Sequence, residues 1–331
     1  MRRLLLAPVL VVALAGCGSA AHGVPKGFQP ETAVAFGPSD IWILGRGAAL
    51  VRSTDGGAHF EQVASPPLRA VGNGPSLLFA NASDGFAYVV YGGGLLYATH
   101  DGGHSWSASL SGVLYVAVGG GYVFAITLGH GLERSPLGRD TWTELSGAQA
   151  KGTTVAADGS RVWLLGPPRQ RPDADTIQKS VDAGRTLTSS RGPCFFELPG
   201  RLVPAGGNVL WAVCPTGMMA SLLRSTDGGR SFPLTRSFHD PDGTTLPPLT
   251  NGAQIFPFSR DAAVVYGGGG GPIFRTTDGG RHWVRTRQPW TLTGAPVWLG
   301  FPTRSVGYAL ASSRLWRTTD GGASWHTVPI H

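Results

Sequence analysis

The chain has 331 residues and a net charge of +7, with 50 glycines, 25 prolines and only 14% charged residues. Glycine and proline are the residues that cost most inside helices, so this composition argues against a helical bundle. Hydrophobic residues make up 42% of the chain, which is too many for a disordered protein. We therefore expect a turn-rich, all-β protein. The sequence has no basic run with interleaved aromatic residues, so we expect no nucleic-acid partner.

Residues 1–16 have the features of a secretion signal. Two arginines precede an apolar stretch that is too short to cross a bilayer as a helix. The segment Leu14-Ala15-Gly16-Cys17 resembles the lipobox of bacterial lipoproteins, in which the cysteine is acylated and becomes the new N-terminus. This resemblance implies a lipid anchor at Cys17, a short tether over residues 17–27 and an extracytoplasmic place in the bacterial cell envelope. An ordinary signal peptide is the alternative.

One eight-residue pattern recurs along the rest of the chain: Ser or Thr, any residue, Asp, any residue, Gly, two further residues and an aromatic. Five copies are complete, the copy at Ser180 lacks the aromatic residue, and the copy at Ser135 lacks the Asp and the Gly. The Asp can accept hydrogen bonds from its own turn, and the Gly can adopt positive φ. We call each copy a patterned turn and interpret its aspartate as structural, not catalytic: Asp55, Asp101, Asp182, Asp227, Asp278 and Asp320.

Each patterned turn lies between the last two strands of a four-strand unit. In the second unit we predict strands over residues 76–80, 86–91 and 95–100, and a fourth from Ser105. A basic residue precedes the pattern in every unit except this one, where Ala98 stands, and we interpret it as packing between strands. A unit that repeats every ~40–50 residues is typical of a propeller blade. The sequence therefore predicts an all-β, seven-bladed β-propeller over residues 28–331.

The pattern resembles the Asp-box, or bacterial neuraminidase repeat, of sialidases, sortilin-type receptors and the photosystem II assembly-factor propellers. The closing unit, from Val297 to Trp325, is most similar to the assembly-factor type. The resemblance implies four-stranded antiparallel blades and, for the assembly-factor type, a protein partner at a membrane. It also leaves open a carbohydrate-active protein, either a sialidase-like glycoside hydrolase or a glycan-binding lectin.

Antiparallel blades place the patterned turns on one face, and the connections around residues 65–69, 167–175, 190–200, 237–252 and 287–294 on the opposite face, which we call the loop face. Exposed arginine and aromatic residues are typical of protein interfaces. We therefore predict a partner-binding surface that is made of Arg69, Arg169, Arg171, Arg191, Phe195, Phe196, Phe238, Arg287 and Trp290. The alternative is that the aromatic residues only cover the ends of the blades.

Two cysteines remain once Cys17 carries lipid. Cys194 lies in the connection that enters the fifth unit, and Cys214 ends the second strand of that unit. Because second strands return to the face where first strands begin, both cysteines should lie on the loop face. In an oxidising compartment we expect a disulfide between them. Two buried free thiols are the alternative.

No catalytic or metal-binding constellation stands out in the sequence. A glycosidase needs two carboxylates across one scissile bond, whereas we assign most of the acidic residues to turns. Asp240 and Asp242 faintly resemble a calcium loop but lack the ligands that should follow. We therefore expect a non-catalytic monomer that binds a protein partner and needs no cofactor or metal, with a glycan as the alternative ligand.

Overall fold

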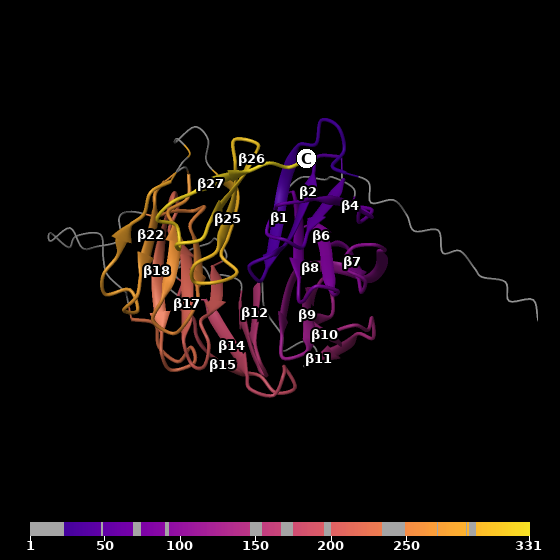
Figure 1. Ribbon diagram of the computed structural model, residues 1–331. Helices are drawn as coiled ribbons and strands as arrows, with labels where there is room; N and C mark the ends of the chain where they lie inside the picture. Colours follow the sequence, from indigo (N-terminus) through magenta and orange to yellow (C-terminus); the bar gives the residue numbers. More distant parts are fainter. Residues whose placement is uncertain are drawn as a thin grey trace, which may run out of the picture.

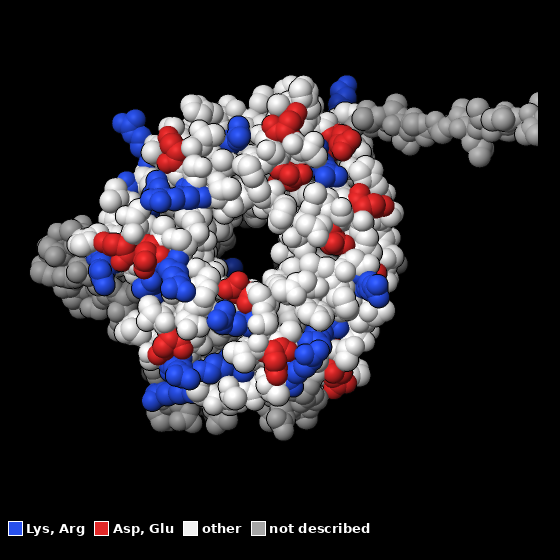
Figure 2. All heavy atoms as spheres, turned by 60° about the horizontal axis from the view of Figure 1, so that its bottom comes forward, with Lys and Arg blue, Asp and Glu red and all other residues white. Residues whose placement is uncertain are grey.

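The computed structural model describes residues 23–331 apart from 48, 69–73, 90–92, 146–153, 167–174, 195–199, 234–248, 270, 289 and 291–295. This part of the chain is all β: its strands form six antiparallel sheets arranged in a ring around a central opening (Figures 1 and 2). Within these residues, nothing forms a helix with the length and apolar character that a membrane crossing requires.

The six sheets follow one another along the chain. Sheet 1 contains β1 (Pro30–Phe36), β2 (Asp40–Gly45), β3 (Leu50–Ser53) and β4 (Glu61–Val63). Sheet 2 contains seven strands: β5 (Pro75–Phe79), β6 (Gly85–Val89), β7 (Gly94–Thr99), β8 (Ser107–Gly119), β9 (Tyr122–Thr127), β10 (Gly131–Pro136) and β11 (Thr143–Leu145).

The remaining sheets have four strands each. Sheet 3 contains β12 (Thr154–Asp158), β13 (Arg161–Leu165), β14 (Thr176–Ser180) and β15 (Thr188–Arg191), and sheet 4 contains β16 (Arg201–Pro204), β17 (Leu210–Pro215), β18 (Met219–Ser225) and β19 (Leu249–Thr250). Sheet 5 contains β20 (Gln254–Pro257), β21 (Ala263–Tyr266), β22 (Ile273–Thr276) and β23 (Val284–Arg285), and sheet 6 contains β24 (Pro296–Gly300), β25 (Gly307–Ala311), β26 (Arg314–Thr318) and β27 (His326–Val328).

Sheet 2 differs from the seven separate units that the sequence predicts. Its long strand β8 pairs with β7 through its first half, where Ser107 opposes Ala98, and with β9 through its second half, where Gly119 opposes Tyr122. The register shifts between Val113 and Tyr115, and such an irregularity lets one strand twist from one sheet direction into the next. The connection expected between the second and third units is therefore a continuous strand, and the structure has six sheets.

Large aromatic residues on the second strands fill the spaces between neighbouring sheets. Trp42, Trp163 and Trp211 are at most 2% exposed. The indole nitrogen of Trp42 in sheet 1 donates a hydrogen bond of 2.9 Å to the carbonyl of Gly102, which belongs to the patterned turn of sheet 2. Trp163 of sheet 3 makes the same bond, of 3.2 Å, to Gly228 of sheet 4. Trp42 and Trp163 thus each connect their own sheet to the patterned turn of the next sheet.

The ring closes between the first and last sheets. Ile43 and Val51 of sheet 1 pack in one buried cluster with Leu310 and Leu315 of sheet 6. The Tyr308 hydroxyl donates a hydrogen bond of 2.7 Å to the carbonyl of Pro38, which is 270 positions away in sequence. Sheets 1 and 6 are each built from consecutive strands, so side-chain packing closes the ring without an exchange of strands.

Candidate binding face

The patterned turns use their carboxylates internally. Asp278 accepts hydrogen bonds from the Thr276 hydroxyl at 2.9 Å and from the His282 amide at 3.0 Å. The Thr276 hydroxyl oxygen in turn accepts the Gly280 amide at 2.9 Å. Burial works against ionisation of Asp278, but the bonds from His282 and Thr276 outweigh it and hold the pKa of this carboxyl at about 2.

The other aspartates of the pattern have equivalent bonds. In each, a hydroxyl from the residue two positions earlier and an amide from the residue four positions later donate to the carboxylate: Asp55, Asp101, Asp182, Asp227 and Asp320. The pKa of every one of these carboxyls is lowered. A carboxylate held ionised by its own turn is a poor general acid near neutral pH.

The basic residues that precede the patterned turns contact the neighbouring sheet. Arg224 of sheet 4 lies 5.5 Å from the Trp211 ring and donates to the Arg260 carbonyl and the Asp261 carboxylate of sheet 5, at 2.6 and 2.8 Å. Arg134 similarly donates to the carbonyl of Ala183 in sheet 3, at 2.6 Å. These contacts agree with the interpretation that the repeated cation serves packing between strands and sheets.

His100 lies at the one junction where the cation is replaced by Ala98. Its Nδ1 is 2.7 Å from an oxygen of Asp84, and its Nε2 is 3.4 Å from an oxygen of Asp140. Partial burial works against the charged imidazole, but the bonds to Asp84 and Asp140 outweigh it and raise the pKa of His100. His100 therefore connects the two halves of sheet 2 where an arginine connects other sheets.

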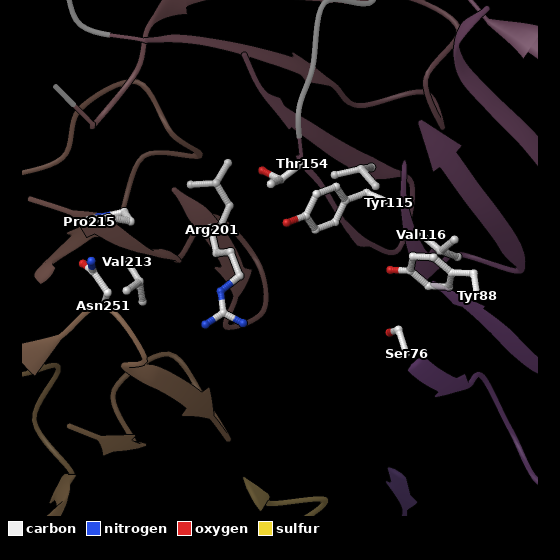
Figure 3. A pocket seen from close by; sticks show the side chains of 11 residues that line it. Ser76, Tyr88, Tyr115, Val116, Thr154, Arg201, Val213, Pro215 and Asn251 are labelled. Carbon is white, nitrogen blue, oxygen red and sulfur yellow. The ribbon is translucent and has the colours of Figure 1, made fainter. Parts of the chain in front are cut away.

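A cavity of about 520 Å³ opens on the loop face (Figure 3). It is lined by residues at the starts of β5, β12 and β16, at the ends of β6 and β17 and within β8, so six strands from three sheets meet there. The lining residues are Ser76, Tyr88, Tyr115, Val116, Thr154, Val155, Arg201, Leu202, Val213, Pro215 and Asn251. Its volume is in the range of ligand-binding pockets.

Arg201 is the charged residue among the described residues that line this cavity. Its side chain is exposed and donates a hydrogen bond of 3.1 Å to the carbonyl of Ala253. Figure 3 shows the guanidinium of Arg201 and the hydroxyl oxygens of Tyr88 and Tyr115 directed into the same space. A cation with hydroxyl groups opposite it can bind a ligand that is rich in oxygen acceptors.

The predicted disulfide is confirmed. Cys194 and Cys214 are bonded, with their Cα atoms 5.2 Å apart. Cys214 lies in β17 between Val213 and Pro215, which both line the cavity. Cys194 also packs against Gly200, since a Cβ on that glycine would collide with the Cys194 sulfur. The disulfide therefore holds the strand pair that carries Arg201 to the cavity wall.

A buried carboxyl group packs against the same disulfide. Asp175 is 2% exposed and accepts a hydrogen bond of 3.0 Å from the Cys194 amide. Its own amide donates to the Cys194 carbonyl at 2.9 Å, so two hydrogen bonds join the two residues. Burial raises the pKa of Asp175 to about 7, although the bond from Cys194 works in the opposite direction.

The predicted partner-binding residues have different positions. Arg191 at the end of β15 and Arg287 after β23 are exposed, but neither lines the cavity. Trp290 is only 5% exposed and packs edge-on against Trp325, with ring centroids 5.4 Å apart. The prediction that Trp290 belongs to an exposed surface is therefore wrong, because its ring fills the core beside sheet 6.

The other predicted residues lie outside the described part of the chain: Cys17, Arg69, Arg169, Arg171, Phe195, Phe196 and Phe238, as do Asp240 and Asp242.

The residues that do line the cavity were missed because they lie on strands. Sequence reasoning favoured the irregular connections, whereas Tyr88, Thr154 and Arg201 stand at strand ends next to the central opening. A polar residue at the first position of a first strand, as in Arg201-Leu202, is the signal that could have identified them.

Across the described residues, no group of His, Cys, Asp and Glu could hold a metal ion.

Comparison with known proteins identifies the fold. No protein-family model and no curated protein matches the chain. Among solved structures, YCF48 from Cyanidioschyzon merolae matches 91% of this chain and 98% of its own, at 14% identity and a TM-score of 0.56. A puromycin-hydrolyzing peptidase of Mycobacterium tuberculosis matches 92% of this chain but 53% of its own, at 14% identity and a TM-score of 0.59. YCF48 bound to a D1 peptide matches 76% of this chain and 77% of its own, at 17% identity and a TM-score of 0.49.

These matches show a shared fold and nothing finer, because all identities are below 25%. The peptidase contains this fold in about half of its length, so the fold occurs both as a nearly complete chain and as part of an enzyme. The chain is similar to β-propellers of both kinds.

We predict that Asp278→Ala destabilises the fold. The substitution leaves the Thr276 hydroxyl and the His282 amide without their acceptor, which should lower the free energy of unfolding by about 1–3 kcal/mol. Urea titration should report this loss, with the exposed Glu31→Ala as the control. An unchanged unfolding midpoint for Asp278→Ala would contradict the structural role of the patterned turn.

We also predict that Asp175 makes stability depend on pH between about 4 and 7. Its pKa is about 7 in the folded chain, against 3.8 for an unperturbed aspartate. Between these values the folded state keeps a proton that the unfolded state has lost, so the free energy of unfolding falls as pH rises and becomes level above 7. Asp175→Asn should remove this fall. Equal pH slopes for both proteins between pH 4 and 7 would rule out the buried carboxyl as the cause.

Proposed function

We propose that this protein is a non-catalytic, lipid-anchored, extracytoplasmic propeller that binds a protein partner through its loop face, in an assembly or scaffold role. The cavity around Arg201 is the observation that carries the proposal. It collects residues from three sheets at the central opening, and binding sites on rigid scaffolds concentrate at such places.

Within this proposal the ring counts seven blades. The first half of β8 completes a four-strand unit with β5, β6 and β7, and its second half begins another with β9, β10 and β11. Each unit then holds one patterned turn, as an Asp-box propeller does. The shared strand makes two blades appear as one sheet of seven strands.

A polypeptide suits the chemistry of the cavity. Arg201 supplies a cation, and Ser76, Tyr88 and Tyr115 supply hydroxyl groups on the opposite side (Figure 3). Backbone carbonyls and acidic side chains of an extended segment can accept hydrogen bonds from these groups. Tyr and Arg are also the residues that contribute most to binding at protein interfaces.

A carbohydrate-active protein remains the second candidate, because aromatic, hydroxyl and guanidinium groups also bind sugars. A glycoside hydrolase needs two carboxylates across the scissile bond. The described residues that line the cavity include neither Asp nor Glu, so the cavity favours binding over hydrolysis. A lectin would show saturable binding of a free glycan.

The anchor and the compartment form the other half of the proposal. The lipobox resemblance at Cys17 supports acylation. The disulfide between Cys194 and Cys214 supports an oxidising compartment, because such bonds are rare where thiols are kept reduced.

The partner site is tested by Arg201→Gln. Cross-linking in intact membranes, followed by purification of the full chain, should capture a protein partner with the wild type and several-fold less with Arg201→Gln. Arg281→Gln, which removes an exposed arginine from a patterned turn, is the matched control. Equal capture by both variants would place the partner elsewhere, and capture of a glycan alone would favour the lectin.

The anchor is tested by Cys17→Ser. Acyl chains at one cysteine give durable attachment to a bilayer, so the wild type should remain with washed membranes and incorporate labelled fatty acid. Cys17→Ser should lose the label and either accumulate unprocessed or leave the membrane fraction. Labelling that persists in Cys17→Ser would refute acylation at this residue.

A further inference from the structure

We infer that His100 makes the connection between the two halves of sheet 2 sensitive to pH, so that the connection is closed when the imidazole is protonated and loosened when the imidazole is neutral. We call this connection the histidine junction, and it consists of His100, Asp84, Asp140 and Ser109. It lies on the face of the patterned turns, opposite the cavity, and the inference does not depend on the proposed partner.

Elsewhere in the ring a permanent cation makes the equivalent connection. An arginine or lysine precedes six of the seven patterned turns, and the guanidinium groups of Arg134 and Arg224 donate to the next sheet. In the second unit this position is Ala98, and His100, two positions further along, spans the gap instead. Arginine stays charged at any ordinary pH, whereas histidine changes its charge near neutral pH. The replacement therefore introduces a titrating group at this point of the ring.

The turn that His100 contacts lacks a carboxylate of its own pattern. Over residues 135–142, Leu137 stands at the position of the Asp and Arg139 at the position of the Gly. The Ser135 hydroxyl donates instead to the Arg139 carbonyl and accepts the Thr141 amide at 3.0 Å. The carboxylate of Asp140 is therefore left to bond outside the turn.

Asp140 bonds to the first half of sheet 2. The Ser109 hydroxyl donates to one Asp140 oxygen at 2.6 Å, and Nε2 of His100 is 3.4 Å from the other oxygen. The Ser109 oxygen also accepts the indole N–H of Trp142 at 2.9 Å, and Trp142 packs against a buried cluster of sheet 2. One network thus holds both the turn and the aromatic residue that ends it.

The geometry of the junction requires the charged form of the imidazole. Nδ1 of His100 is 2.7 Å from an Asp84 oxygen, and Nε2 faces Asp140. A carboxylate only accepts hydrogen bonds, and an imidazole has an N–H on both nitrogens only when it is protonated. The other oxygen of Asp84 accepts the Asn81 side-chain amide at 2.7 Å, which fixes this carboxylate. We therefore expect loss of the proton to break the longer contact, the one to Asp140.

The direction of the pH effect follows from the pKa of His100. Burial lowers this pKa, but the bonds to Asp84 and Asp140 outweigh burial and raise it above the usual 6.5. A histidine whose pKa is raised by folding stabilises the folded state below its unfolded value, and this contribution is lost as pH rises through the folded value. The junction should therefore be closed below about pH 6.5 and loosen above it.

The other charged groups around the junction are engaged elsewhere. Asp101 accepts hydrogen bonds from its own turn, and Nδ1 of His104 is 2.6 Å from the Asp101 carbonyl. Arg52 of sheet 1 lies against Gly102, where a Cβ would be 2.5 Å from its guanidinium. Arg139 is exposed. Among the described residues, His100 is the imidazole that contacts both facing carboxylates.

The junction and the cavity share a strand. Ser109 lies in the first half of β8, and Tyr115 and Val116 of the same strand line the cavity. The consequence for the cell rests on the proposed extracytoplasmic location, where the protein meets the pH of its surroundings. The histidine junction gives the ring a means of responding to that pH.

The inference is tested by amide hydrogen exchange of the full chain, measured by mass spectrometry between about pH 5.5 and 8.5 and corrected for the intrinsic exchange rate. The reporting amides are those of Leu137, Arg139 and Thr141, which are hydrogen-bonded within or beside the turn. Their protection should fall several-fold as pH rises above about 6.5. The turn over residues 318–325 is the internal control. Its carboxyl, Asp320, has a pKa of about 2, so its protection should stay constant.

Three variants separate His100 from other sources of pH dependence. His100→Arg keeps a permanent cation at the junction, and Asp140→Asn keeps the shape of the side chain without its charge, so protection of the turn should not change with pH in either. His282→Gln is the matched control. It removes an imidazole whose Nδ1 is 2.5 Å from Asp278 but which has a single carboxylate partner among the described residues, so this variant should respond to pH like the wild type.

Two results would overturn the inference: constant protection of the wild-type turn across this pH range, or an equal fall of protection in Asp140→Asn or His100→Arg. Circular dichroism checks that the variants fold, and Asp140→Asn keeps the test open if the larger arginine disrupts the junction. None of these results bears on partner capture with Arg201→Gln, so failure of this inference is distinguishable from failure of the proposed function.

Discussion

The structure depends on the contact between a second-strand aromatic residue and the patterned turn of the next sheet. Trp211 illustrates it: a Cβ on Gly280 would lie 2.9 Å from the Trp211 ring, and Gly280 has a φ of +86°. The glycine is thus required twice, by the backbone conformation and by the close approach of the indole. Trp42 and Trp163 add a hydrogen bond to the equivalent turns. Repetition of this contact fixes the sheets relative to one another and defines the central opening.

This architecture separates stability from binding. The carboxylates that recur in the sequence are held ionised by their own turns, and the arginines beside them contact the neighbouring sheets. The cavity on the loop face takes its polar groups from positions that do not recur, such as Tyr88, Thr154 and Arg201. Repeated residues therefore build the scaffold, and unrepeated residues at the same strand ends give one region of it a distinct chemistry.

The region around the disulfide connects the repeated scaffold to the cavity. Cys194 and Cys214 join the entry of sheet 4 to its second strand, and Asp175, which directly precedes β14 of sheet 3, is buried against Cys194. Burying a carboxyl group with one hydrogen bond is unfavourable when it is ionised. This unfavourable free energy is located next to the cavity wall that carries Arg201. A fixed position of that wall would serve ligand binding in the cavity.

The sequence by itself determined the local structure. The patterned turns, the strands around them and the all-β class follow from short-range rules, because a turn's hydrogen bonds and a strand's alternation involve only neighbouring residues. The pairing of Cys194 with Cys214 could be expected because the strand order brings both cysteines to one face and only these two remain once Cys17 is set aside. Tertiary structure decided what depends on residues far apart in the chain. It made β8 one strand shared by two units, it placed Trp290 against Trp325 in the core, and it brought Tyr115, Thr154 and Arg201 to one cavity. Those outcomes depend on how sheets pack around the ring, and a linear pattern carries no information about which unrepeated side chains that packing brings together.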